Sequence, residues 1–365
     1  MCFPFSTLPP LLRVHPEIAG MFADKMDILS LSNWRSTCRI NYAHGSSSLR
    51  RTLTSRLRAF VPYPLDFIDL VTTRGGIFGG ELALSFVLRT GTFRPSILEI
   101  YSSNFCYEKL CEAILDDPAI RVRIEKHTFF TSTLFHALHR LVASTLIIHL
   151  ANGMSIHVIQ SYTCSPFAPI SRAPCTALSN FVTAYSFGCS HPVLTLSRRA
   201  LLADKELAYF SPSDSATLDR LLSHEFAMAV SPSAWPEYRR MFENNQLWSP
   251  EDCWREKFVC PNQGRFFGDK GSLVGYFDPL GGDEEKCIKY NVAPFGPMVI
   301  WRLMTTFECD DGCEYLDEVM DQGVTSIPVL FRKDPFGELH DCISDWFTPT
   351  APLYRHTRRP RAYSM

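Results

Sequence analysis

The sequence has little excess of either charge. Its 365 residues carry 36 Lys and Arg against 38 Asp and Glu, a formal net charge of -2. A near-neutral chain has no general attraction for nucleic acid or for an anionic membrane, so we expect neither among its partners. The exception is the basic tail over 351–365, with Arg355, Arg358, Arg359 and Arg361, which we expect to be flexible.

The sequence also lacks the features of a disulfide-rich secreted protein. It has thirteen cysteines, an odd number without regular spacing, and it begins with MCFPFSTLPP, which has no charged segment followed by a long apolar run. These features predict reduced, buried thiols and a cytoplasmic or nuclear location.

The stretch between Arg140 and Arg172 contains no Asp, Glu, Lys or Arg. It is interrupted by His149, Asn152 and His157, which a membrane span of roughly 20 apolar residues disfavours. Asn152-Gly153 lies between two apolar runs, 146–150 and 155–159, and such a pair is typical of a tight hairpin turn. We therefore predict two buried strands and no transmembrane segment.

Helical and alternating patterns divide the rest of the chain. Apolar spacing predicts short helices within 8–60, and Pro62 and Pro64 mark the end of that region. Helices and strands then alternate over 66–205, including strands at 96–101 and 121–125 and helices at 134–142 and 176–184, which favours an α/β fold with a mixed sheet. Residues 206–350 are read as a C-terminal α/β extension of uncertain fold, with a strand at 298–301.

Gly79-Gly80 precedes a predicted helix over 81–88. Glycines at a helix start let backbone N–H groups approach a phosphate, which the helix dipole also favours. The pair lacks the Lys-Ser/Thr ending of a P-loop and the spacing of a dinucleotide-binding motif. Two interpretations follow, a phosphate site and a tight turn with close backbone packing.

The chain resembles a group of fungal, basidiomycete-type proteins in which an F-box-like N-terminus precedes a divergent nucleotidyltransferase-like domain. The resemblance covers about 8–202 and is carried by segments 77–84, 97–101, 154–159, 165–170, 175–182 and 191–196. It implies a nucleotidyltransferase-like core over 66–205, preceded by a small helical F-box-like region over 8–60.

In a working nucleotidyltransferase, carboxylates at alternate positions of one strand and a third on a neighbouring strand hold two metal ions. The resemblance places Ile97, Glu99 and His157 at these positions. Isoleucine cannot bind a metal, and imidazole suits transition metals better than Mg²⁺. If the register is shifted by two residues, Glu99 takes the first position and Tyr101 the second. Either way the site is incomplete, so we expect a non-catalytic protein that needs no cofactor.

The N-terminal region resembles an F-box, which docks on a Skp1-type subunit of a cullin ubiquitin ligase. The residues expected to contact this partner are Pro16, Ile18, Leu29, Leu31 and Trp34. The expected function is that of a binding or adaptor protein. Alternatively, the helices only cap the α/β domain.

Another alternative is a template-independent nucleotidyltransferase, or a nucleotide-binding pseudoenzyme, that uses Gly79, Gly80 and Glu99 with nucleotide and Mg²⁺. For that enzyme, folding would have to bring Asp66, Asp69, Glu81 or Glu125 to Glu99 as replacement metal ligands.

Overall fold

The computed structural model describes residues 15–89, 91–133, 140–203, 212–238, 254–261, 263–276, 298–303, 329–333 and 339–341. The basic tail over 351–365 lies outside these residues.

Three helices open the described chain: α1 (Pro16–Lys25), α2 (Ile28–Arg35) and α3 (Arg39–Leu57). Pro16 is at the start of α1, where its missing N–H removes no helical hydrogen bond. Asp27 caps α2 by accepting hydrogen bonds from the backbone N–H groups of Leu29 and Ser30, both at 2.9 Å. The helical prediction for this region is confirmed, but α3 is longer than expected, at 19 residues.

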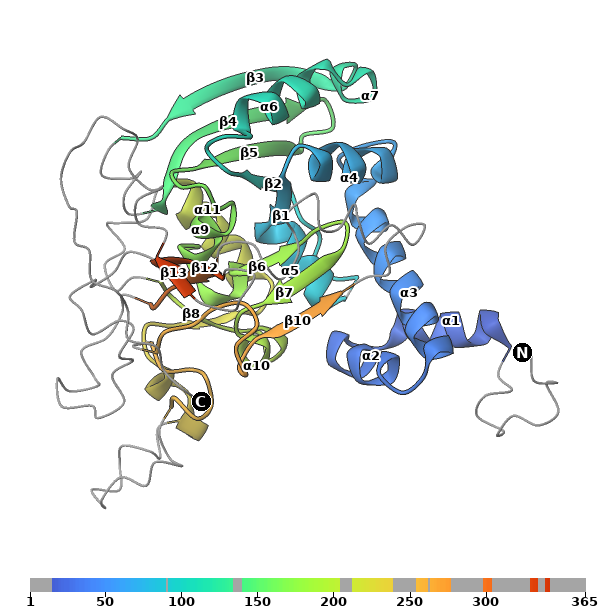
Figure 1. The fold of residues 1–365 in the computed structure, drawn as a ribbon, viewed down its shortest axis with the longest axis vertical. Helices are drawn as coiled ribbons and strands as arrows, with labels where there is room; N and C mark the ends of the chain where they lie inside the picture. Colours follow the sequence, from blue (N-terminus) through green and yellow to red (C-terminus); the bar gives the residue numbers. More distant parts are fainter. Residues whose placement is uncertain are drawn as a thin grey trace.

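An eight-stranded mixed sheet forms the centre of the molecule (Figure 1). Only β2 and β5 run parallel, and all other neighbouring strands are antiparallel. The strand order is β10 (Leu273–Tyr276), β7 (Ser186–Cys189), β6 (Asn180–Val182), β1 (Gly76–Gly79), β2 (Ile97–Ser102), β5 (Ser155–Ser161), β4 (Val142–Leu150) and β3 (Ile124–Thr131). The predicted mixed α/β class is confirmed.

Further elements surround this sheet (Figure 1). The helices are α4 (Pro64–Thr73), α5 (Gly80–Leu88), α6 (Tyr107–Asp116), α7 (Pro118–Arg121), α9 (Phe167–Ser171), α10 (Pro192–Leu196) and α11 (Pro212–Ser223), with short 3₁₀ turns at Thr176–Leu178 and Pro232–Ala234. β8 (Arg199–Leu201) pairs with β9 (Ala227–Ala229). A three-stranded sheet joins β11 (Met298–Ile300), β12 (Val329–Lys333) and β13 (Leu339–Asp341).

Alternate residues of the central strands pack on opposite faces of the sheet, as the two-residue period of a strand requires. One face contributes Phe78, Leu98 and Ile100 to the main core, together with Phe67 of α4 and Leu110 of α6. The other face contributes Ile77, Tyr101 and Ile159 to a smaller cluster with Ile170 of α9. Glu99 has the same strand parity as Tyr101 and therefore belongs to this second face.

The N-terminal helices belong to the same hydrophobic core as the sheet. Leu49, Leu53 and Leu57, one turn apart along α3, are at most 3% exposed and pack in the main core. Ile28 and Leu31 of α2 join the same cluster. The helical region is therefore fixed against the α/β domain along the whole second half of α3.

Two predicted elements differ from the structure. The helix predicted over 176–184 is wrong: the chain makes a 3₁₀ turn and then strand β6, because Phe181 and Val182 are used in the sheet between β1 and β7. The strand predicted over 121–125 begins only at Ile124, since α7 occupies Pro118–Arg121. Of the helix predicted over 134–142, residues 134–139 lie outside the described chain, and β4 already begins at Val142.

The hairpin at Asn152-Gly153 is confirmed, with β4 and β5 antiparallel and Gly153 at a φ of +80°. In the described part of the chain, no helix combines the length and apolar character needed to span a membrane. Within the described ranges, Cys38, Cys106, Cys111, Cys175 and Cys189 are free thiols. Burial raises the pKa of Cys175 and that of Cys189 to about 12, so both stay protonated.

Candidate functional site

Side chains of the protein itself occupy the space in front of the glycine turn between β1 and α5. A Cβ atom added to Gly79 would lie 2.5 Å from Cε2 of Tyr101, and one added to Gly80 would lie 1.3 Å from Oε2 of Glu99. Gly80 also has a φ of +54°, in the left-handed region. Both glycines are buried. The turn is therefore explained by close packing against β2, and its front is occupied by a carboxyl group and an aromatic ring.

The register of the sheet places Glu99 between the glycine turn and His157. In β1–β2, Glu99 pairs with Gly79, and in the parallel pair β2–β5 it pairs with His157. Paired positions of adjacent strands share a face, so Ile97, Glu99 and His157 point to the same side of the sheet. Glu99 is hydrogen-bonded to the Tyr101 side chain. Ser155 Oγ lies 3.0 Å from Nε2 of His157.

Burial makes the uncharged forms of Glu99 and His157 the stable ones. It is the largest of the causes that raise the pKa of Glu99 to about 8, followed by the neighbouring charges of Glu81 and Asp214. It lowers the pKa of His157 to about 4, with smaller contributions from His149 and Arg220. At neutral pH the site therefore contains a protonated carboxyl group and a neutral imidazole, whereas Mg²⁺ prefers ionised carboxylates.

The other carboxylates considered as replacement ligands are not available to Glu99. Asp66 and Asp69 are exposed on α4, which packs against the opposite face of the sheet. Glu125 is on β3, separated from β2 by β4 and β5. Within the described ranges, no group of three or more His, Cys, Asp and Glu side chains is placed to hold a metal ion.

Glu81 lies closer, but its carboxylate is used to hold the fold together. Its side chain is 2% exposed. One oxygen accepts a hydrogen bond from the backbone N–H of Ser96 at 2.9 Å, and the other is 2.6 Å from Nε of Arg220 on α11. A second ion pair, Arg140 to Asp214 at 3.0 Å, also joins α11 to this face. Sequence reasoning missed Asp214 and Arg220, since they lie over 110 residues beyond Glu99 and no local motif identifies them.

The N-terminal helices carry the second candidate site. Ile18, Met21 and Phe22 of α1 are 47%, 67% and 59% exposed, and Leu29 at the start of α2 is 40% exposed. Because they are three and four positions apart, Ile18, Met21 and Phe22 lie on one side of the helix. We call these three residues the α1 docking face. Met21 and Phe22 were not among the residues predicted to contact a partner.

The residues predicted to bind a partner do not all share this exposure. Pro16 and Ile18 are exposed, as expected. Leu31 is fully buried in the main core, so the prediction that its side chain contacts a partner is wrong. Trp34 is partly buried against the core, and its ring stacks on His44 at a centroid distance of 6.4 Å.

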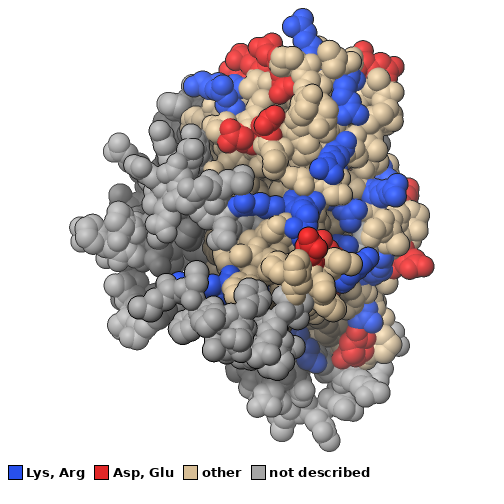
Figure 2. Space-filling view, turned by 90° about the vertical axis from the view of Figure 1, so that its right-hand side faces the viewer, with Lys and Arg blue, Asp and Glu red and all other residues tan. Residues whose placement is uncertain are grey.

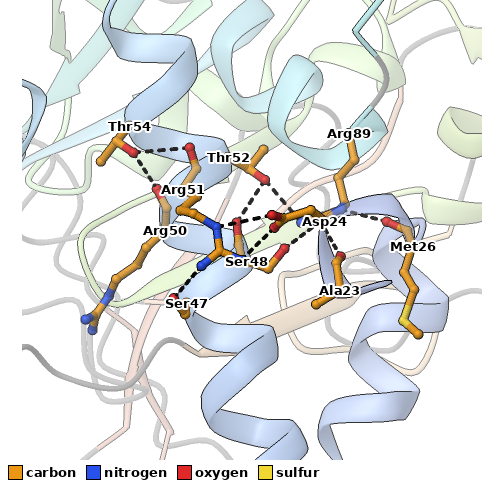
Figure 3. A network of polar contacts seen from close by, with 10 residues as sticks. All are labelled: Ala23, Asp24, Met26, Ser47, Ser48, Arg50, Arg51, Thr52, Thr54 and Arg89. Atoms are coloured by element: carbon orange, nitrogen blue, oxygen red, sulfur yellow. Dashed lines mark hydrogen bonds and ion pairs between the residues drawn. The ribbon is translucent and has the colours of Figure 1, made fainter. Parts of the chain in front are cut away.

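A partly buried arginine attaches the N-terminal helices to the sheet domain (Figure 3). Arg89 follows α5 with a φ of +54°. Its guanidinium donates to the carbonyl oxygens of Ala23 and Met26, both at 2.8 Å, and to Oγ of Ser48 at 2.9 Å. Burial lowers the pKa of Arg89 to about 10, which leaves it charged at neutral pH. No sequence motif marked this residue.

Two further contacts support the same attachment. Arg51 of α3 forms an exposed ion pair with Asp24 of α1 at 2.8 Å (Figure 3). Arg35 of α2 donates to Oγ of Ser46 at 3.0 Å and to the backbone carbonyl of Tyr276 in β10. The helices are thus tied both to α5 and to one edge of the central sheet.

Comparison of the chain with protein-family models, curated proteins and solved structures gives no match. The function is therefore inferred from the geometry of the glycine turn and of the docking helices.

Proposed function

We propose that the protein is a non-catalytic adaptor that binds a partner protein through the α1 docking face. The observation that carries this proposal is the exposure of Ile18, Met21 and Phe22 on a helix whose other contacts are fixed to the core. An apolar helix face presented in this way suits insertion into a groove on another protein.

Burial of the α1 docking face would contribute favourably to binding. Burying an apolar side chain such as Ile, Met or Phe contributes about 1.5–3 kcal/mol. Only part of this gain appears as affinity, because association also costs translational, rotational and side-chain freedom. Holding α1 in place through Arg89 reduces the ordering cost, since the helix need not fold on binding.

The partner that we propose is a Skp1-type subunit of a cullin ubiquitin ligase, as implied by the F-box resemblance. The exposure of Pro16, Ile18 and Leu29 supports this choice. Figure 2 shows Lys and Arg side chains gathered across the middle of the face that lies on the right in Figure 1. α3 and the residue after it carry no Asp or Glu but five arginines: Arg39, Arg50, Arg51, Arg56 and Arg58. A partner with acidic groups around its groove would be favoured.

The glycine turn supports the absence of catalysis in this proposal. Its one surviving candidate metal ligand, Glu99, packs against Gly80 and favours the protonated form. The remaining metal positions hold Ile97 and His157. Two-metal transfer needs several ionised oxygen ligands around one point, which this arrangement does not provide.

Calorimetric titration of the full chain with a purified Skp1-type protein tests the proposal. We expect the wild type to bind and Phe22→Asp to weaken binding by at least about 30-fold, which corresponds to about 2 kcal/mol. Phe22→Asp should keep the wild-type melting temperature, because Phe22 is exposed. The matched control is Val193→Asp, which changes a similarly exposed residue of α10 and should leave binding unchanged. Equal affinities for wild type and Phe22→Asp would contradict the proposal.

A second candidate is nucleotide binding, with or without transfer, through Gly79, Gly80 and Glu99. The observation in its favour is that Glu99 and His157 occupy paired positions beside the turn. It requires Glu99 to ionise and to leave its place against Gly80. A thermal-shift titration with each nucleoside triphosphate, with and without Mg²⁺ or Mn²⁺, tests it: a metal-dependent stabilisation lost in Glu99→Ala would support this second function.

A further inference from the structure

The two edge strands of the central sheet, β10 and β3, differ in their backbone contacts. At one edge, the backbone carbonyl of Tyr276 in β10 accepts a hydrogen bond from Arg35. At the other edge is β3, and no strand in the described ranges pairs with its outer side. Seven of its eight residues are exposed, and only Ile124 is partly buried. An exposed edge strand offers unpaired backbone N–H and C=O groups to another strand.

Apolar side chains lie on both faces of this edge strand. Phe129 pairs across β3–β4 with Leu146, and Phe130 pairs with Thr145, so the two rings point to opposite sides of the sheet. They are 57% and 53% exposed. Two adjacent, exposed phenylalanines on an edge strand carry a cost in water that pairing with a further strand would remove.

Features that normally protect an edge strand are confined to the start of β3. A β-bulge interrupts the register between Ile124 and Lys126, and Lys126 supplies a charge. From His127 to Thr131 the strand contains no Asp, Glu, Lys, Arg or Pro. The second half of β3 is therefore open to pairing.

We propose that β3 pairs antiparallel with β3 of a second copy of this chain, about a twofold axis at Thr128. A twofold axis perpendicular to the sheet keeps each side chain on its own face, so opposed residues have numbers that sum to 256. Lys126 then lies opposite Phe130 of the second copy, and His127 lies opposite Phe129 of the second copy. The two Thr128 residues face each other across the axis.

In this register, the opposed side chains form favourable pairs. A lysine ammonium over a phenylalanine ring is a cation–π pair, and His127 with Phe129 is an aromatic pair. Each pair occurs twice in the dimer, and cross-strand pairs of this kind contribute roughly 0.2–1 kcal/mol each. Centring the axis on Lys126 would instead place two like charges opposite each other. Because Thr128 is near the middle of β3, no other register gives a longer overlap.

The symmetry predicts a closed dimer in place of a growing fibre. The same surface is used by both copies, so the interface is self-complementary and is complete after one association. In the dimer, the two eight-stranded sheets would be continuous across the axis. The α1 docking face belongs to a different part of the molecule and is not used in this contact.

Sedimentation velocity of the full chain over a range of concentrations tests the proposal with two matched variants. Phe130→Lys places a lysine opposite Lys126 of the second copy, whereas Phe130→Glu places a carboxylate there. Both variants lose the ring at the same exposed position and differ only in charge. We expect a reversible monomer–dimer equilibrium for the wild type, and a dissociation constant for Phe130→Lys at least about tenfold weaker than for Phe130→Glu.

Each outcome decides the proposal. A Lys126→Glu, Phe130→Lys double variant restores opposite charges at both pairs, so it should dimerise more tightly than Phe130→Lys alone. A wild type that remains monomeric up to about 100 µM would overturn the proposal. So would equal dissociation constants for Phe130→Lys and Phe130→Glu, because the pairing of position 130 with Lys126 would then be wrong. Circular dichroism and melting temperature confirm that each variant is folded.

Discussion

The glycine turn and the apolar residues of α1 are two sequence patterns associated with binding. They differ in that the fold buries the first and leaves the second exposed. At the turn, Gly79 and Gly80 are buried beneath Tyr101 and Glu99. On α1, Ile18, Met21 and Phe22 remain outside although the helix is firmly attached through Arg89. In the first region the fold itself uses the pattern, and in the second it leaves the pattern available to a partner.

This difference shows what a binding motif requires beyond its residues. Glycines at a helix start allow a close approach, but the approaching group here comes from the neighbouring strand. Apolar residues on a helix favour burial, but α1 already packs on α3 through its other side, where Ala23 is buried. Surface that remains exposed after such packing is the part that can bind another molecule.

The largest effect is expected from filling the glycine turn. Gly80→Ala introduces a Cβ in the left-handed region and forces Glu99 out of its place, so we expect a loss of about 4 kcal/mol in unfolding free energy. The control is Gly153→Ala at the tip of the β4–β5 hairpin, where φ is also positive but nothing lies within 4 Å. That change should cost only about 1 kcal/mol. Urea unfolding of both variants measures the difference, and equal losses would show that Glu99 yields freely.

The attachment of the docking helices should depend on Arg89 far more than on the exposed Arg51–Asp24 pair. Arg89→Ala leaves the carbonyls of Ala23 and Met26 without this donor, and we expect a loss of about 3 kcal/mol. Arg51→Ala removes a solvent-exposed ion pair and should cost less than about 1 kcal/mol. Chemical denaturation provides both values. A larger loss for Arg51→Ala than for Arg89→Ala would reverse this interpretation of how α1 is held.

The smallest effect is a pH dependence that originates at Glu99. Its pKa is raised from 4.5 to about 8, so the folded protein holds a proton that the unfolded chain releases between these values. The contribution of Glu99 to stability is therefore fully present below pH 4.5 and is lost as the pH rises toward about 8. Glu99→Gln removes this titration, and we expect it to gain on the order of 2 kcal/mol relative to wild type at pH 8, a value reduced because the Glu99 side chain is only partly buried.

Melting curves of wild type and Glu99→Gln from pH 5 to 8.5 measure this dependence. The two curves should converge toward pH 5, and parallel curves would show that Glu99 is ionised throughout. His157 acts in the opposite direction, because its pKa is lowered to about 4 and folding resists its protonation below about 6.5. Its contribution changes between about pH 6.5 and 4 and so overlaps the lower part of the tested range, but it is common to wild type and Glu99→Gln and cancels in their difference.

Sequence reasoning succeeded where a local pattern was sufficient. The hairpin at Asn152-Gly153 followed from turn chemistry, and the strand predicted at 96–101 followed from its apolar run. It failed over 176–184, because the pairing of Phe181 and Val182 with distant strands outweighed their apparent helical pattern. It also placed Leu31 on the surface, since a helical spacing alone does not tell which apolar side faces the core.

The sequence by itself determined the mixed α/β class and the helical N-terminus, because composition and periodicity are local properties. Only the tertiary structure decided that Glu99 and Tyr101 fill the glycine turn, that Arg89 holds α1, and that Leu31 is buried while Ile18 is exposed. Each of these outcomes depends on which distant segments meet. These segments meet because β2, α3 and α5 pack around a shared core.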